Sequence, residues 1–94
     1  MTPRFADKRT QAFANGEHVA AFSGIRRTAE RRLAYLLSAV SLEDIRAIPA
    51  HKLHKLSGDR QGQWAIWINE QYRLCFEWDA DEKMATNIEI TDYH

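Results

Sequence analysis

The apolar residues in the first half of the chain recur at helical spacing. Between Ile25 and Val40 they return every three or four positions, which predicts one amphipathic helix with a single buried stripe. That stripe consists of Ile25, Ala29, Leu33, Leu36, Leu37 and Val40. Residues 8–15 predict a shorter helix, and Ser41 predicts the N-cap of a third helix that Pro49 would end.

The second half of the chain changes to a period of two. Apolar and polar side chains alternate over residues 64–68 and 72–78, the pattern of half-buried strands joined by a tight turn. A polar loop leads to a last strand at about residues 85–93, and residues 53–57 predict a strand before the others. These elements predict an α+β fold in which N-terminal helices pack on one face of a mainly antiparallel sheet. We expect one small domain over residues 1–94.

The alternation also predicts which side chains point away from the helices. If Ile66 and Leu74 face the helices, Trp67 and Arg73 project from the opposite face of the sheet. A sheet face without helices must be polar or occupied, so we expect functional groups there.

Composition narrows the class of protein. A chain of 94 residues with 45% hydrophobic composition can bury one modest core. It has no apolar run close to the roughly 18–20 residues of a membrane span and no charged-then-apolar leader, so we expect a cytoplasmic protein with no membrane partner. The single Cys75 allows neither an intrachain disulfide nor a cysteine metal cluster, and we expect it to be buried. His18 and His51 are interpreted as isolated surface imidazoles.

The net charge of zero hides an asymmetry. Residues 1–60 carry eleven Lys and Arg against six Asp and Glu, whereas residues 61–94 carry two against seven. A basic half can attract a polyanion such as RNA and an acidic half a basic partner, unless the halves only neutralise each other across the fold. Four arginines lie on the long predicted helix outside its apolar stripe: Arg26, Arg27, Arg31 and Arg32. This surface is either a solvated helix face or a contact with a nucleic acid or an acidic partner segment.

Residue types suited to cleaving RNA without a metal are spread over three segments. The reaction requires a base for the 2′-hydroxyl proton, an acid for the leaving 5′-oxygen, and cations around the phosphate. His54, Arg73, Asp92 and His94 supply these types, and a strand pinned to a sheet would hold the last three residues, 92–94, in place. The sequence has no metal-ligand spacing, nucleophile motif or phosphate loop, so we expect no metal and no other cofactor.

Three strings of the sequence resemble one known family. They are K-L-H-x-L-x-G-D-R at residues 52–60, G-Q-W-A-I-W-I-N-E-Q-Y-R-L-C-F at residues 62–76, and D-Y-H at the end of the chain. Together they resemble the HigB branch of the RelE/ParE toxin superfamily over essentially the whole chain. The resemblance implies a toxin of a bacterial type II toxin-antitoxin pair that cuts mRNA in the ribosomal A site without a metal. It also implies a helix-turn-helix antitoxin as a partner.

The same resemblance assigns roles to individual residues. His54 matches the catalytic histidine of the family, Arg73 its strand arginine, and Asp92, Tyr93 and His94 its terminal triad. The chain-terminal carboxylate of His94 favours its imidazolium, so His94 is expected to be the general acid, with either Asp92 or His54 as the base. Tyr93 would stack on or orient a nucleotide, and Arg73 would stabilise charge on the phosphate. The expected RNA-binding residues are Lys52, Lys55, Arg60 and Trp67.

Two positions depart from the family pattern. Ser57 stands where members commonly have lysine, and Trp67 stands where they often have a basic residue. Both changes remove positive charge from the expected RNA surface, which weakens binding unless Lys55 or the arginine-rich helix compensates. Two alternatives therefore stay open beside the ribosome-dependent nuclease. One is a ParE-like toxin that inhibits DNA gyrase, and the other is an attenuated module that binds the antitoxin without cleaving RNA.

Overall fold

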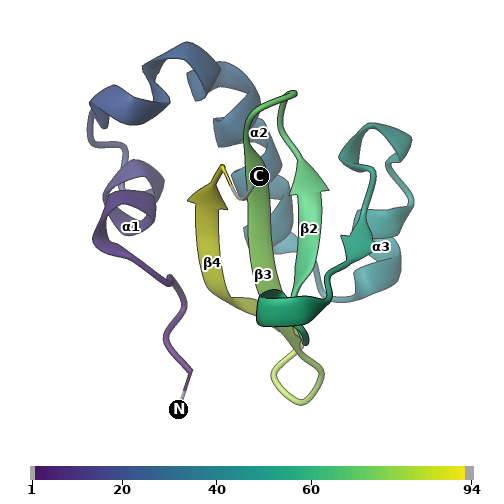
Figure 1. Cartoon of the computed structure of the whole chain (residues 1–94). Coiled ribbons are helices and arrows are strands. Elements are labelled where there is room, and N and C mark those ends of the chain that lie inside the picture. Colours follow the sequence, from purple (N-terminus) through teal and green to yellow (C-terminus); the bar gives the residue numbers. More distant parts are fainter. Residues whose placement is uncertain (1, 93–94) are drawn as a thin grey trace.

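The structure, a computed structural model, describes residues 2–92 and consists of a four-stranded antiparallel sheet with helices on one face. The strands are β1 (His54–Lys55), β2 (Trp64–Trp67), β3 (Arg73–Asp79) and β4 (Met84–Thr91), and they lie side by side in chain order (Figure 1). An extended N-terminal segment pairs in parallel with β4, where Phe5 lies opposite Ile88. The predicted α+β architecture is confirmed.

Six helical segments precede or interrupt the strands. The α-helices are α1 (Lys8–Ala14), α2 (Arg26–Ser38) and α3 (Leu42–Arg46), and the 3-10 turns are η1 (Ala20–Ile25), η2 (Pro49–His51) and η3 (Gly58–Arg60). Side chains cap two of the helices, and the cap at Ser41 is the one that the sequence predicts. The Asp7 carboxylate accepts from the Thr10 amide at 2.8 Å, and the Ser41 hydroxyl accepts from the Asp44 amide at 3.2 Å. Each bond satisfies an amide that the first helical turn leaves without a backbone partner.

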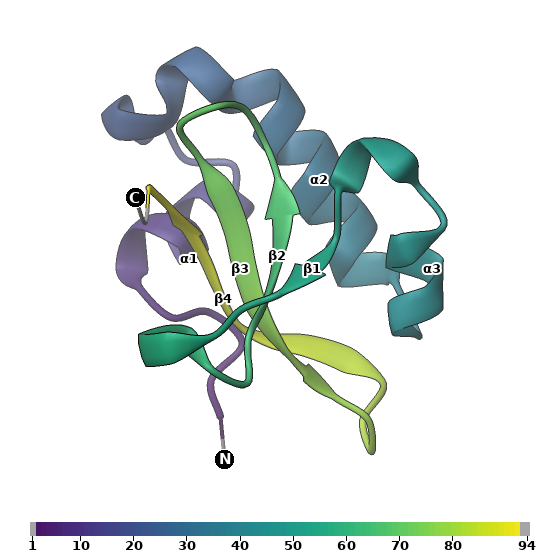
Figure 2. The same ribbon diagram turned by 45° about the vertical axis from the view of Figure 1, so that its right-hand side comes forward.

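The core lies between α2 and the sheet. Its α2 stripe of Ala29, Leu33 and Leu36 packs with alternate strand residues, which are Ile66, Ile68, Leu74, Phe76, Ile88 and Ile90. Figure 2 shows α2 running behind the sheet, while the loop that carries η3 crosses on the other side. The face turned away from α2, here called the outer face, carries the complementary alternate residues of the strands.

Five details differ from the sequence-based expectations. Val40 is 63% exposed and lies outside the buried stripe, because α2 ends at Ser38 and the chain turns away before it. The first strand contains only residues 54–55, and the last strand ends at Thr91. The 3-10 turn η1 before α2 has no strong apolar period and was not predicted. His51 is 2% exposed, so its interpretation as a surface imidazole was wrong.

Candidate active site

The outer face presents two rows of side chains that cross the sheet. One row is formed by His54, Ala65, Cys75 and Glu89, which are opposite one another on β1, β2, β3 and β4. The next row is formed by Trp67, Arg73 and Thr91 on β2, β3 and β4. Neighbouring strands place paired side chains about 5 Å apart, so each row is a continuous surface. The predicted placement of Trp67 and Arg73 away from the helices is confirmed.

His54 is exposed at the start of the first row, on the short edge strand β1. Its ring nitrogen Nδ1 lies 3.0 Å from the carbonyl oxygen of Lys52. A carbonyl oxygen only accepts, so Nδ1 carries the hydrogen of the neutral ring and Nε2 keeps its lone pair. Lys52 can offer this carbonyl because its backbone is left-handed, with φ of 48°. The arrangement leaves His54 with the tautomer that a proton acceptor at Nε2 needs.

Arg73 is half-buried in the second row and is held by the turn between β2 and β3. Its Nη1 donates to the carbonyl oxygen of Asn69 and, at 3.1 Å, to that of Tyr72. The side chain of Asn69 closes the same turn by accepting from the amide of Tyr72 at 2.7 Å. The turn therefore holds the guanidinium in a fixed position. A fixed guanidinium can bind a phosphate with a defined geometry.

Asp92 follows directly after β4 and reaches the same turn. Its Oδ2 accepts from Nε2 of Gln71 at 3.3 Å, and the residue is exposed. The turn that binds Arg73 thus also contacts Asp92, which places Asp92 beside the Arg73 end of the sheet. Tyr93 and His94 lie outside the described residues. Of the five predicted catalytic residues, the register places His54 and Arg73 on the outer face, and Asp92 lies directly after β4 beside the turn that holds Arg73.

The four predicted RNA-binding residues lie in different surroundings. The Lys52 ammonium is 4.5 Å from the centre of the Trp67 ring, so these two side chains form one unit on the outer face. Lys55 is next to His54 on β1 and therefore points to the opposite side of the strand, where its ammonium is 5.7 Å from the Trp64 ring centre. Arg60 forms an ion pair with Glu89 of the outer face.

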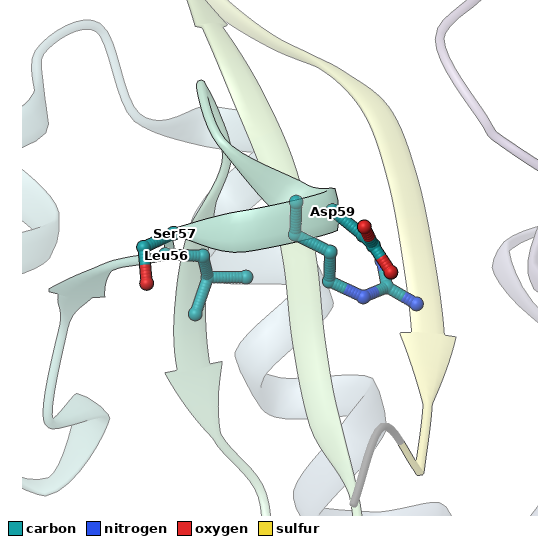
Figure 3. Close-up of a pocket in the computed structure, with 4 residues that line it drawn as sticks. Leu56, Ser57 and Asp59 are labelled. Carbon is teal, nitrogen blue, oxygen red and sulfur yellow. The ribbon is translucent and has the colours of Figure 1, made fainter.

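Arg60 is bound by two partners that the sequence did not single out. Its Nη1 donates at 3.1 Å both to Oε1 of Gln63 and to Oε1 of Glu89, and this ion pair is about three-quarters buried. The loop that carries Arg60 lines a hollow of about 320 Å³, and Figure 3 shows Leu56, Ser57 and Asp59 on that loop as it crosses the strands. The register makes Glu89 a partner of the loop, since it is opposite Cys75 on the outer face.

Cys75 lies beneath this ion pair and is completely buried. Burial raises the pKa of its thiol to about 11, so the thiol is neutral at physiological pH. The expected buried cysteine is confirmed, and the side chain fills space in the outer face without supplying a nucleophile.

Two further properties of residues 2–92 bear on the class of site. Within this range no three His, Cys, Asp or Glu side chains are grouped so that they could hold a metal ion. No helix in the same range is long and apolar enough to cross a membrane.

A four-stranded antiparallel sheet backed by helices is consistent with a RelE-like fold. A family model described as a RelE-like toxin of type II toxin-antitoxin system HigB matches residues 3–94. The chain belongs to this HigB-like toxin family, so its partner is a cognate antitoxin.

Two relatives agree with this assignment. Toxin HigB-1 of Vibrio cholerae serotype O1 is 32% identical over 80 residues, which cover 83% of this chain and 84% of the relative. Endoribonuclease HigB of Proteus vulgaris is 39% identical over 44 residues, which cover 47% of this chain and 46% of the relative.

Proposed function

We propose that this toxin is an endoribonuclease that cuts mRNA in the ribosomal A site and so arrests translation. The observation that carries the proposal is the placement of His54 and Arg73 on the outer face, with Asp92 beside the turn that holds Arg73. The printed name of the Proteus vulgaris relative, an endoribonuclease, supports the same chemistry. As a HigB-like toxin, the protein is held inactive by its antitoxin, which we propose to be a helix-turn-helix protein of the HigA type.

In the proposed reaction the RNA supplies its own nucleophile, and no metal takes part. His54 accepts the 2′-hydroxyl proton at Nε2, a role supported by the bond of its Nδ1 to Lys52. The 2′-oxygen then forms a bond to phosphorus while the bond to the 5′-oxygen breaks. The products are a 2′,3′-cyclic phosphate and a free 5′-hydroxyl end.

The remaining groups stabilise charge and return the proton. Arg73 faces the negative charge that develops on the phosphate oxygens. The imidazolium of His94 protonates the leaving 5′-oxygen, and Tyr93 orients the adjacent nucleotide. Asp92, next to the Arg73 turn, is the alternative to His54 as the proton acceptor. Lys52, Arg60 and Trp67 contact the RNA on the outer face, and Lys55 contacts it from the edge of β1.

The experiment that tests this function is cleavage of a defined mRNA on programmed ribosomes. We expect cuts with the native protein that disappear in His54→Ala and His94→Ala and when the nucleotide before the cut lacks its 2′-hydroxyl. His18→Ala is the matched control, because His18 is an exposed histidine elsewhere on the protein, and it should cleave normally. Growth arrest without cuts would favour gyrase inhibition, and neither cuts nor arrest would favour an antitoxin-binding module.

A further inference from the structure

We propose that Trp67 is a stacking surface for one nucleobase next to the cleaved phosphodiester, and that Lys52 is an exchangeable cover of that surface. When a base arrives, the Lys52 ammonium leaves the ring and contacts the RNA backbone. The inference rests on the proposed function and names a nucleobase subsite within the same site.

The position of Trp67 is the first observation. Trp67 is directly opposite Arg73, and Arg73 is directly opposite Thr91, so the indole belongs to the row that contains the proposed phosphate-binding arginine. Paired side chains on adjacent strands are about 5 Å apart. A nucleotide whose phosphate meets Arg73 therefore has its base within reach of the Trp67 ring.

The surroundings of Trp67 differ from those of the other two tryptophans. Trp64 and Trp78 pack against the hydrophobic core, as half-buried aromatic residues of a sheet commonly do. Trp67 does not contribute to that core; it lies on the outer face and is half-buried. A large aromatic ring on a solvated sheet face gives no core packing, but it gives a flat surface of the kind on which single-stranded RNA bases stack.

Lys52 is built to cover the ring reversibly. Its ammonium lies 4.5 Å from the ring centre, while its backbone is fixed by its left-handed conformation and by the bond from its carbonyl to His54. The side chain is exposed, so it can swing without moving the backbone that positions His54. Because the Lys52 side chain is exposed, its ammonium makes a weak contact with the ring in comparison with a stacked base, and a released ammonium gains a phosphate partner. The exchange therefore favours bound RNA.

The carbonyl of Trp67 is held from the side of the helices. Arg32, on α2, donates from Nε to this oxygen at 3.3 Å. The end of β2 is thus anchored while the indole faces the outer side, which keeps the stacking surface in one position. A purine offers more surface for stacking than a pyrimidine does, so we expect this subsite to prefer a purine.

The test uses a short single-stranded RNA with every 2′-hydroxyl methylated, which binds without being cut. Affinity is measured for this RNA and for copies in which one nucleotide at a time is abasic. Indole N–H resonances are followed in parallel by NMR, where Trp64 and Trp78 serve as internal references. Variants are Trp67→Leu, Trp67→Phe and Lys52→Met, with Trp64→Phe as the matched control because Lys55 lies 5.7 Å from the Trp64 ring on the core side.

We expect the Trp67 resonance to shift with intact RNA and to lose that shift when one particular nucleotide is abasic. Trp67→Leu should lower affinity about 5- to 100-fold, the loss of one stacked base, and should no longer respond to the abasic nucleotide. Trp67→Phe should retain part of the affinity and Trp64→Phe all of it. Lys52→Met should keep the Trp67 shift and lower the dependence of log affinity on log salt by about one unit.

Equal affinity of Trp67→Leu and the native protein would overturn the subsite, and so would a native protein whose Trp67 resonance ignores RNA. These results are independent of cleavage, because the methylated RNA cannot react. If the protein cuts mRNA on ribosomes but no base stacks on Trp67, the nuclease proposal is supported and the subsite is refuted. Stacking without cuts would refute the nuclease and leave the subsite standing.

Discussion

At the scale of single residues, the structure shows how neighbouring backbone groups prepare reactive side chains. A carbonyl of the turn after η2 selects the tautomer of His54, and carbonyls of the β2–β3 turn hold the guanidinium of Arg73. Both arrangements come from backbone carbonyls that are close to these residues in the chain. The site is thus made ready by chain geometry, which costs no reorganisation when the substrate binds.

The tethered guanidinium of Arg73 leads to a prediction about cleavage. Arg73→Ala should slow cleavage on ribosomes by about 2 to 3 kcal/mol of transition-state stabilisation, or roughly 30- to 150-fold, as is typical for loss of one oxyanion donor. Arg73→Lys should recover little of this, because an ammonium lacks the planar fork that binds both turn carbonyls and a phosphate. The measurement is the single-turnover rate. An Arg73→Lys rate close to native would contradict the role of the fork.

At the scale of elements, the segment from α3 to β1 connects a buried histidine to the site. His51 ends η2, and its Nδ1 lies 2.9 Å from the carbonyl oxygen of Ile45 on α3. Its ring also contacts Tyr35 of α2 edge-on, at 5.0 Å between ring centres. His51 therefore ties two helices to the backbone that leads into β1, only three residues before His54.

The burial of His51 makes stability depend on pH. Burial lowers the pKa of its imidazole from the ordinary value of 6.5, so the folded protein keeps the ring neutral. Below about pH 6.5 the unfolded chain binds a proton that the folded chain refuses, and the free energy of unfolding falls as pH falls. His51→Asn keeps an N–H near the position of Nδ1 but cannot titrate.

Urea unfolding at pH 7.5 and pH 5.5 measures this effect. The native chain should lose more stability on acidification than His51→Asn does, and the difference isolates His51 because the other titrating groups are shared. Equal losses in the two proteins would show that the buried ring does not control the acid sensitivity.

The elements also show how far sequence patterns reach. The N-cap at Ser41 and the alternation of β2 and β3 were sufficient to predict α3 and the central strands. The burial of His51 was not predictable, since it depends on Ile45 and Tyr35 meeting it in three dimensions. Likewise the Arg60–Glu89 pair joins residues 29 positions apart, and only the register of β3 and β4 brings them together.

At the scale of the whole molecule, the structure shows where part of the basic half of the chain lies. Arg26, Arg27 and Arg31 are exposed on α2 and line a shared surface hollow with Ser23 and Gly24. Arg32 differs from them, since it is half-buried and bonded to the Trp67 carbonyl. The basic surface of α2 thus lies behind the sheet, away from the outer face.

This location leads to a prediction about the antitoxin. Reversing charge in Arg27→Glu and Arg31→Glu together should weaken the complex by 10-fold or more at low salt, since opposed charges lose attraction and gain repulsion. Substituting Leu or Gln for Arg27 and Arg31 would distinguish the effect of lost charge from the effect of changed side-chain size. Affinity is measured by calorimetry with the cognate antitoxin at two salt concentrations. Unchanged affinity of the double reversal would exclude this surface as the antitoxin contact.

By itself, the sequence determined the elements, the order of helices before strands, the family, and the residue types of the candidate site. These follow from local properties: hydrophobic period, capping chemistry, turn residues and short motifs. Only the tertiary structure decided that His54 and Arg73 share one sheet face with Asp92 beside the Arg73 turn, that Arg60 binds Glu89, and that Lys52 covers Trp67. The reason is physical: strand register and side-chain contacts are set by packing between segments distant in the chain, which no local pattern encodes.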